Sequence, residues 1–168
     1  VNPVYTGPFR GAPIAPLSQG APWLRRGFAA LAPSSAPGPA PMPEPLFSVS
    51  TFAGRGDATP LPLPPRSWGE LQRVIFGKHA IREAKDGPAF APATFRPGGR
   101  RLAADAEQLT LAVLDVDKGR ASIPEVAARL EAEGLAHVIY TTHSHRVGQP
   151  AFRVVLPLAR PGPVAAWP

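Results

Sequence analysis

Apolar residues cluster in four segments whose patterns predict β-strands. Residues 46–53 carry β-forming residues in partial alternation, which predicts a first strand. Residues 109–116 form a nearly continuous apolar run, which is typical of a central strand covered on both faces. Residues 137–142 and 152–156 predict two more strands, and the short loop between them indicates antiparallel pairing.

Two helices are predicted, and each opens with a capping box. In residues 67–70 and again in 122–125, a Ser is followed three positions later by a Glu. The first helix is expected to end near Gly77 and the second at Gly134. Because the second helix joins two predicted strands, residues 109–142 form a β-α-β unit with an expected right-handed crossover. The predicted fold class is therefore α/β.

Composition divides the chain after residue 41. Residues 1–41 contain nine of the 24 prolines, no acidic residue and no sustained helical or strand period. Such a segment cannot bury enough apolar surface to offset its ordering entropy. We expect either a disordered tail or, because position 1 is Val, sequence upstream of a true start at Met42. Residues 42–168 then form the folded domain.

Charge and cysteine content exclude several classes of protein. The formal net charge of +6 favours a polyanionic partner, such as nucleic acid or nucleotides. The chain has no Cys, which excludes a disulfide framework, a thiolate zinc site and a cysteine nucleophile, and favours the cytoplasm. Since no apolar run approaches the roughly 18 residues of a membrane span, a soluble protein without a membrane partner is expected.

The positive charge is concentrated between residues 55 and 101, where nine Lys and Arg stand against four Asp and Glu. Within this region, residues 78–101 are predicted to form an irregular basic segment that contains turn signals. Arg96, Arg100 and Arg101 are candidates for contact with a nucleic-acid template. The alternative for these three arginines is a solvated basic loop.

Asp115 and Asp117 lie two residues apart at the end of the apolar run. The period of two in a strand puts both carboxylates on one face, where they can share a cation. Mg²⁺ or Mn²⁺ prefers such ligands and keeps positions open for phosphate oxygens, so the pair suits nucleotidyl or phosphoryl transfer. Alternatively, the two carboxylates face solvent or cap the following turn or helix.

Three further candidates follow the strand at 137–142. His143 and His145 flank Ser144, and the two imidazoles share a face if the strand extends this far. They could join the two aspartates in a zinc site, or a His and the Ser hydroxyl could donate to a triphosphate. The alternative is a structural role in the loop.

Arg153 interrupts an otherwise apolar strand, where an unpaired guanidinium would be costly. It therefore needs an anion. That anion is either Asp115 or Asp117 in a structural ion pair, or a ligand phosphate held bidentately.

The order of these motifs carries a resemblance to a known family. Residues 113–119, 138–145 and 152–158 together resemble the catalytic core of archaeo-eukaryotic-type primases, in the branch found in phage and plasmid replication proteins. Residues 85–96 and the helix start at Ser67 also resemble that branch. The similarity covers roughly residues 46–168.

This resemblance implies an RRM-like β-α-β core with a mixed sheet. The metal-binding acidic pair of the family falls on Asp115 and Asp117. Its strand-end motif, which contacts the phosphates of the incoming nucleotide, falls on Ser144 and His145, with His143 as the competing alignment. The resemblance also implies a triphosphate-binding role for the basic residue on the following strand, which here is Arg153.

One feature of the family is missing from the sequence. The family completes its metal site with an acidic residue on a later strand, and no Asp or Glu follows Glu133. We therefore expect the chain to be an N-terminal piece of a longer replication protein, incomplete at its C-terminus. Its expected activity in the full-length protein is metal-dependent nucleotidyl transfer, with a DNA template, nucleoside triphosphates and a replicative helicase domain or protein as partners. The alternatives are a non-catalytic DNA-binding initiator module and a metal-dependent nuclease.

Overall fold

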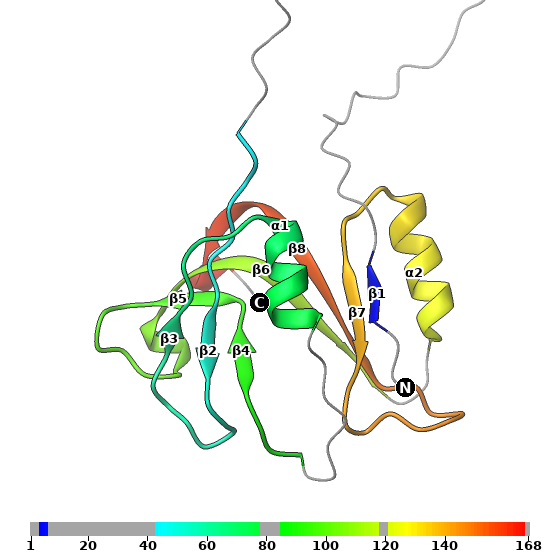
Figure 1. Ribbon diagram of the computed structural model, residues 1–168, viewed down its shortest axis with the longest axis horizontal. Helices are drawn as coiled ribbons and strands as arrows, with labels where there is room; N and C mark the ends of the chain where they lie inside the picture. Colours follow the sequence, from blue (N-terminus) through cyan, green and yellow to red (C-terminus); the bar gives the residue numbers. More distant parts are fainter. Residues whose placement is uncertain (1–3, 7–42, 78–84, 118–120, 167–168) are drawn as a thin grey trace, which may run out of the picture. The chain divides into compact units, whose positions relative to one another are not determined.

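A computed structural model describes residues 4–6, 43–77, 85–117 and 121–166. Every helix and strand given below lies in one compact unit (Figure 1).

The main sheet has five strands in the order β1-β7-β8-β6-β5, and every neighbouring pair is antiparallel. Their bounds are Val4–Thr6 for β1, Ala93–Phe95 for β5, Ala106–Val116 for β6, Val138–Thr141 for β7 and Phe152–Pro163 for β8. Because β8 runs antiparallel to both β6 and β7, the strands β6 and β7 are parallel to each other with β8 between them. This is a split β-α-β arrangement, so the predicted α/β fold class with a β-α-β core is confirmed. The expected mixed sheet was wrong, because β8 lies between the two parallel strands and pairs antiparallel with each of them.

The middle strand of the sheet is β8, and the prediction that residues 109–116 form the central strand was wrong in this respect. β6 has a neighbour on each side, but only Thr110–Ala112 in its middle are buried. Leu114 is 48% exposed. The apolar run of β6 therefore does not indicate a strand that is covered along its whole length, because the ends of β6 are open to solvent.

A second, smaller sheet has the order β3-β2-β4. It consists of β2 (Ser50–Phe52), β3 (Leu61–Pro62) and β4 (Ala89–Ala91). The strand predicted at 46–53 thus forms only in part, although Phe47 adds an isolated bridge to Arg66.

Residues 78–101 are not irregular throughout, because β4 and β5 lie within them. Both are three-residue strands whose stability comes from pairing, β4 with β2 and β5 with β6, rather than from a local pattern. Residues 78–84 lie outside the described part of the chain. The same is true of residues 1–41 apart from β1, so the prediction for that segment stays a prediction.

Both predicted capping boxes are present. Ser67 opens α1 (Trp68–Leu71), which continues into the π-helical turn η1 (Gln72–Phe76). Ser122 opens α2 (Ile123–Ala132), and Gly134 follows its end with a positive φ of 67°, as a helix stop requires. A short 3₁₀ turn, η2 (Ala103–Asp105), directly precedes β6, and a second one, η3 (Val164–Ala166), directly follows β8.

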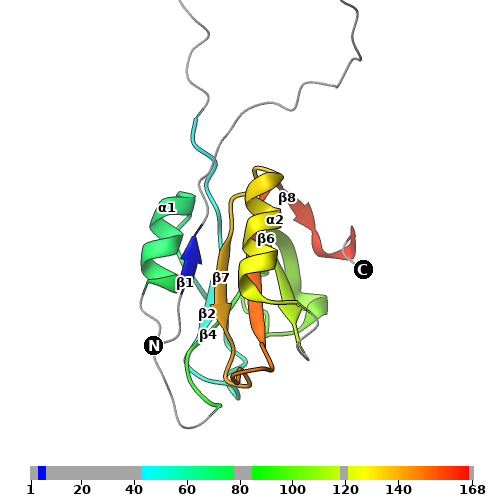
Figure 2. The ribbon, with the colours of Figure 1, turned by 90° about the vertical axis from the view of Figure 1, so that its right-hand side faces the viewer.

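The two helices cover opposite faces of the main sheet (Figure 2). On one face, side chains of α1 and η1 pack on alternate residues of the strands, including Leu111, Val138 and Val155. On the other, α2 packs on Phe152 and Val154. The period of two in each strand therefore decides which helix a given side chain meets.

No helix in the described ranges is long and apolar enough to cross a membrane.

Candidate functional site

Three polar side chains lie in one row across the main sheet. In the strand register, Asp115 of β6 is opposite Arg153 of β8, and Arg153 is opposite Tyr140 of β7. All three alternate with residues packed under α1, so they share the α1 face of the sheet. Tertiary structure thus brings together residues that are up to 38 positions apart in the sequence.

Asp115 and Arg153 form a bidentate ion pair. Nε of Arg153 donates to Oδ1 of Asp115 at 2.5 Å, and its Nη2 donates to Oδ2 at 3.3 Å. The side chains are 53% and 45% exposed, so both remain open to solvent. The pairing with Asp115 raises the pKa of Arg153 further above its ordinary value. Of the anions considered for Arg153, the one in place is Asp115.

Tyr140 is the third member of the row. Its ring lies 5.8 Å from the ring of Phe76, between centroids, and packs against the core under α1. Burial raises the pKa of the Tyr140 phenol, and the positive charge of the adjacent Arg153 guanidinium opposes this shift. In the strand register, Tyr140 and Asp115 therefore flank Arg153 on its two sides.

Asp117 follows the end of β6 by one residue and is exposed. Among the residues that the structure describes, no three His, Asp or Glu side chains come together as metal ligands. Mg²⁺ is commonly bound by one or two carboxylates together with water and substrate phosphates, so a third protein ligand is not required. A carboxylate has about four lone-pair sites, which leaves Asp115 able to bind a cation beside the guanidinium. If Mg²⁺ or Mn²⁺ binds here, Asp115 and Asp117 are the residues that would hold it together with substrate phosphates.

The hairpin loop between β7 and β8 carries the predicted phosphate-binding residues. His145 is half-buried, and its Nδ1 accepts from the backbone N–H of Ala151 at 3.3 Å. Nη1 of Arg146 donates to the carbonyl oxygens of His143 and His145 at 2.9 and 2.7 Å. His145 thus has the structural role that we considered as its alternative, which leaves its Nε2 as the nitrogen for a ligand.

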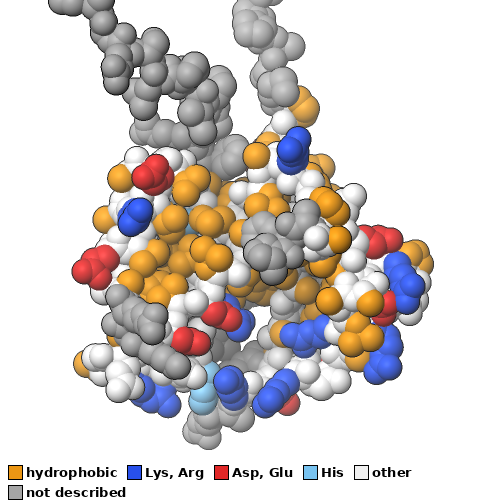
Figure 3. Space-filling model, turned by 180° about the vertical axis from the view of Figure 1, so that it is seen from behind, with side chains coloured by type: hydrophobic (Ala, Val, Ile, Leu, Met, Phe, Trp, Pro, Cys, Tyr) orange, Lys and Arg blue, Asp and Glu red, His pale blue; other side chains and the backbone are white. Residues whose placement is uncertain are grey.

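Ser144 and His143 are exposed at the tip of the same loop. Because β6 and β7 are parallel, this loop and the aspartates extend from the same end of the sheet. Seen from behind, charged and His side chains surround a hollow in the lower part of the molecule, whereas apolar side chains cover much of the upper part (Figure 3).

The three predicted nucleic-acid contacts lie at the other end of β6, in the loop that joins it to β5. Asp105 is 6% exposed and organises this loop. Its carboxylate pairs with Arg96 at 2.5 Å and accepts from the backbone N–H of Arg100 at 2.7 Å. The guanidinium of Arg101 lies 4.5 Å above the ring of Phe52. The structure therefore does not bring these arginines to Asp115.

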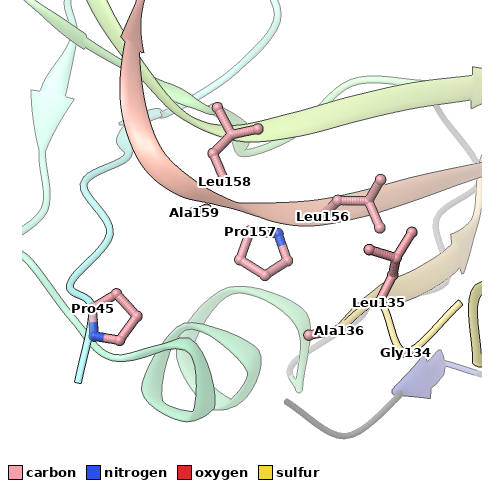
Figure 4. Close-up of a pocket in the computed structure, with 8 residues that line it drawn as sticks. All are labelled: Pro45, Gly134, Leu135, Ala136, Leu156, Pro157, Leu158 and Ala159. Atoms are coloured by element: carbon pink, nitrogen blue, oxygen red, sulfur yellow. The ribbon is translucent and has the colours of Figure 1, made fainter. Parts of the chain in front are cut away.

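An apolar groove lies between β8 and the segment that follows α2. It is lined by Leu135 after α2, by Leu156 and Leu158 of β8, and by prolines that include Pro45 (Figure 4). Its lining contains no charged side chain. The groove is therefore separate from the candidate site.

Sequence reasoning missed Tyr140 and Asp105. Tyr140 alternates with the core residue Val138, so its pattern is that of packing, and only the strand register places it beside Arg153. Asp105 precedes the strand as a single carboxylate without a motif. Its one sequence signal is its position between three arginines and a strand start.

Comparison with known proteins identifies a family. The family model described as VapE N-terminal domain matches residues 73–166, which is more than half of the chain and includes the row of three residues and the β7–β8 loop. This match fits the N-terminal domain of a phage or plasmid replication protein. No curated protein and no solved structure matches the chain.

Proposed function

Because the chain belongs to the VapE N-terminal domain family, we propose that it is the nucleotidyl-transfer domain of a phage or plasmid replication protein, of the DNA primase or primase-polymerase class. Its partners in this role are a DNA template, nucleoside triphosphates and a replicative helicase domain or protein. The proposal rests chiefly on one observation. The carboxylate of Asp115 and the guanidinium of Arg153 lie together, exposed, near the end of a sheet from which exposed Asp117 and a Ser- and His-bearing loop also extend.

The guanidinium of Arg153 is suited to bind a triphosphate without leaving Asp115. An arginine has five N–H donors, and two of them are used in the bidentate pair. Three donors therefore remain for phosphate oxygens or other acceptors. Ser144, His145 and, as the second choice of histidine, His143 are the further donors that we assign to the triphosphate.

The reaction is an attack by the 3′-hydroxyl of a primer, or of an initiating nucleotide, on the α-phosphorus. A new O–P bond forms, the bond between the α-phosphorus and the bridging oxygen breaks, and pyrophosphate leaves while the hydroxyl proton passes to solvent. Mg²⁺ or Mn²⁺ held by Asp115 and Asp117 would supply neutralisation of the charge on the phosphate oxygens. Arg153 and the loop would orient the triphosphate for this attack.

A second candidate is a non-catalytic nucleic-acid-binding module. It is favoured by the ion pair itself, because Asp115 has a protein partner and could be structural. In that case, the arginines of the β5–β6 loop would bind DNA, and the acidic pair would have no chemical role.

The test is template-directed incorporation of labelled nucleotide by the whole chain, with Mg²⁺ or Mn²⁺ present. We expect incorporation by the wild type and its loss in Asp115→Ala and in Asp117→Ala. Glu107→Ala is the matched control, because it removes an exposed carboxylate from the same strand. Incorporation that persists in both aspartate variants refutes the assignment. A gel shift without product favours the binding module, and degradation of single-stranded DNA without added nucleotides favours a nuclease.

A further inference from the structure

Arg153 projects from the middle strand of the sheet onto a surface where its guanidinium is half-exposed. A long side chain in such a place loses rotamer entropy whenever it is held in one orientation to bind a ligand. Groups that hold it before the ligand arrives therefore increase affinity by preorganisation. Asp115 holds one edge of the guanidinium, through Nε and Nη2.

Tyr140 approaches the same guanidinium from the strand on the opposite side of β8. It is paired with Arg153 in register on the same face of the sheet, and the two side chains are close enough to influence each other's pKa. Arginine has only N–H donors, so the phenol oxygen is the group that can accept from it. Arg153 thus has an oxygen suited to its N–H donors on each neighbouring strand.

The ring of Tyr140 is itself fixed by packing. It contacts the ring of Phe76 in η1 and lies against the core formed with Val138 and Val155. A hydroxyl on a packed ring has little freedom apart from rotation of its O–H bond. Tyr140 therefore has a fixed position beside the guanidinium, whereas the carboxylate of Asp115 is exposed and less restrained.

We propose that Tyr140 is a positioning residue that orients Arg153 toward the nucleotide phosphates. This inference rests on the proposed function and deepens it. Tyr140 acts through Arg153 and does not touch the reacting atoms. Its hydroxyl is accordingly needed for nucleotide affinity and not for the chemical step.

The test uses Tyr140→Phe in the whole chain, because this change removes the hydroxyl and keeps the ring that packs on Phe76. We expect the KM for nucleotide, and its dissociation constant in equilibrium titration, to rise roughly three- to tenfold, with kcat nearly unchanged. Tyr5→Phe, the same change at the other tyrosine of the chain, is the matched control. Thermal unfolding of both variants reports any loss of folded protein.

A second variant separates positioning from general packing. If Tyr140 acts through Arg153, Tyr140→Phe added to Arg153→Ala causes no further weakening of nucleotide binding. Equal weakening in both backgrounds overturns the proposal, as does an unchanged KM in the single variant. A wild type that binds no nucleotide overturns the proposed function as well, whereas a wild type that binds nucleotide while Tyr140→Phe binds equally well overturns this inference alone.

Discussion

Asp105 and Asp115 lie at opposite ends of β6, ten residues apart, and each holds an arginine. Asp105 pairs with Arg96 at the start of the strand, and Asp115 pairs with Arg153 near its end. A strand rises about 3.3 Å per residue, so the two carboxylates are roughly 30 Å apart. In Figure 1 the β5–β6 loop lies on the left and the β7–β8 loop at the lower right.

This separation predicts that the affinity for DNA depends on the length of the duplex. A duplex advances about 3.4 Å per base pair, so roughly nine base pairs are needed to reach from the arginines of the β5–β6 loop to Asp115. We expect affinity for a primed template to rise once the duplex exceeds that length. Fluorescence anisotropy over a series of duplex lengths, at fixed salt, measures this dependence.

Arg100→Ala combined with Arg101→Ala should remove the gain with length and reduce the salt dependence of binding. Arg129→Ala is the control, since it removes an exposed positive charge from α2. If affinity is the same for short and long duplexes, or if the control variant loses as much as the double variant, the β5–β6 loop is not the second contact.

Asp105 also makes a prediction about stability. The carboxylate is buried and accepts the backbone N–H of Arg100 in addition to its pairing with Arg96. Asp105→Ala leaves that N–H without its acceptor, so we expect the free energy of unfolding to fall by about 1–3 kcal/mol. Urea unfolding measures the change.

Glu107→Ala serves as the comparison for Asp105→Ala, because Glu107 is exposed two residues further along. Its effect should stay within about 0.5 kcal/mol. Equal effects of the two substitutions would contradict the structural role that we assign to Asp105.

The sequence predicts best the features that depend on neighbouring residues. The capping box at Ser122 and the helix stop at Gly134 are local, and α2 begins and ends accordingly. The three-residue strands β4 and β5 have no such local signal, because pairing with distant strands creates them. Local patterns also cannot give the register between strands.

The same limit applies to the candidate site. The period of two correctly indicates that residues two positions apart in a strand share a face. The insertion of β8 between β6 and β7 is a property of the whole chain, and this insertion puts Arg153 between Asp115 and Tyr140. The anion for Arg153 and the role of Tyr140 could therefore be found only once the topology was known.

The capping box of α2 gives a prediction for both stability and pH. The hydroxyl of Ser122 accepts from the backbone N–H of Glu125 and donates to its carboxylate. Ser122→Ala removes both contacts, so we expect a loss of about 1 kcal/mol at neutral pH, measured by urea or thermal unfolding. Glu131→Ala, at an exposed position of the same helix, should change stability by less than half as much.

The effect of Ser122→Ala should also depend on pH. Hydrogen bonds from the backbone N–H and the hydroxyl of Ser122 lower the pKa of Glu125 below its usual value of 4.5. A lowered pKa in the folded state means that the hydrogen bonds to the Glu125 carboxylate stabilise the protein fully above pH 4.5. Their contribution to stability is lost as the pH falls through the lowered pKa. The difference in melting temperature between the wild type and Ser122→Ala should therefore be largest near neutral pH and shrink below pH 4.5. A difference that stays constant down to pH 3 would show that the hydroxyl stabilises the helix through the backbone N–H of Glu125 alone.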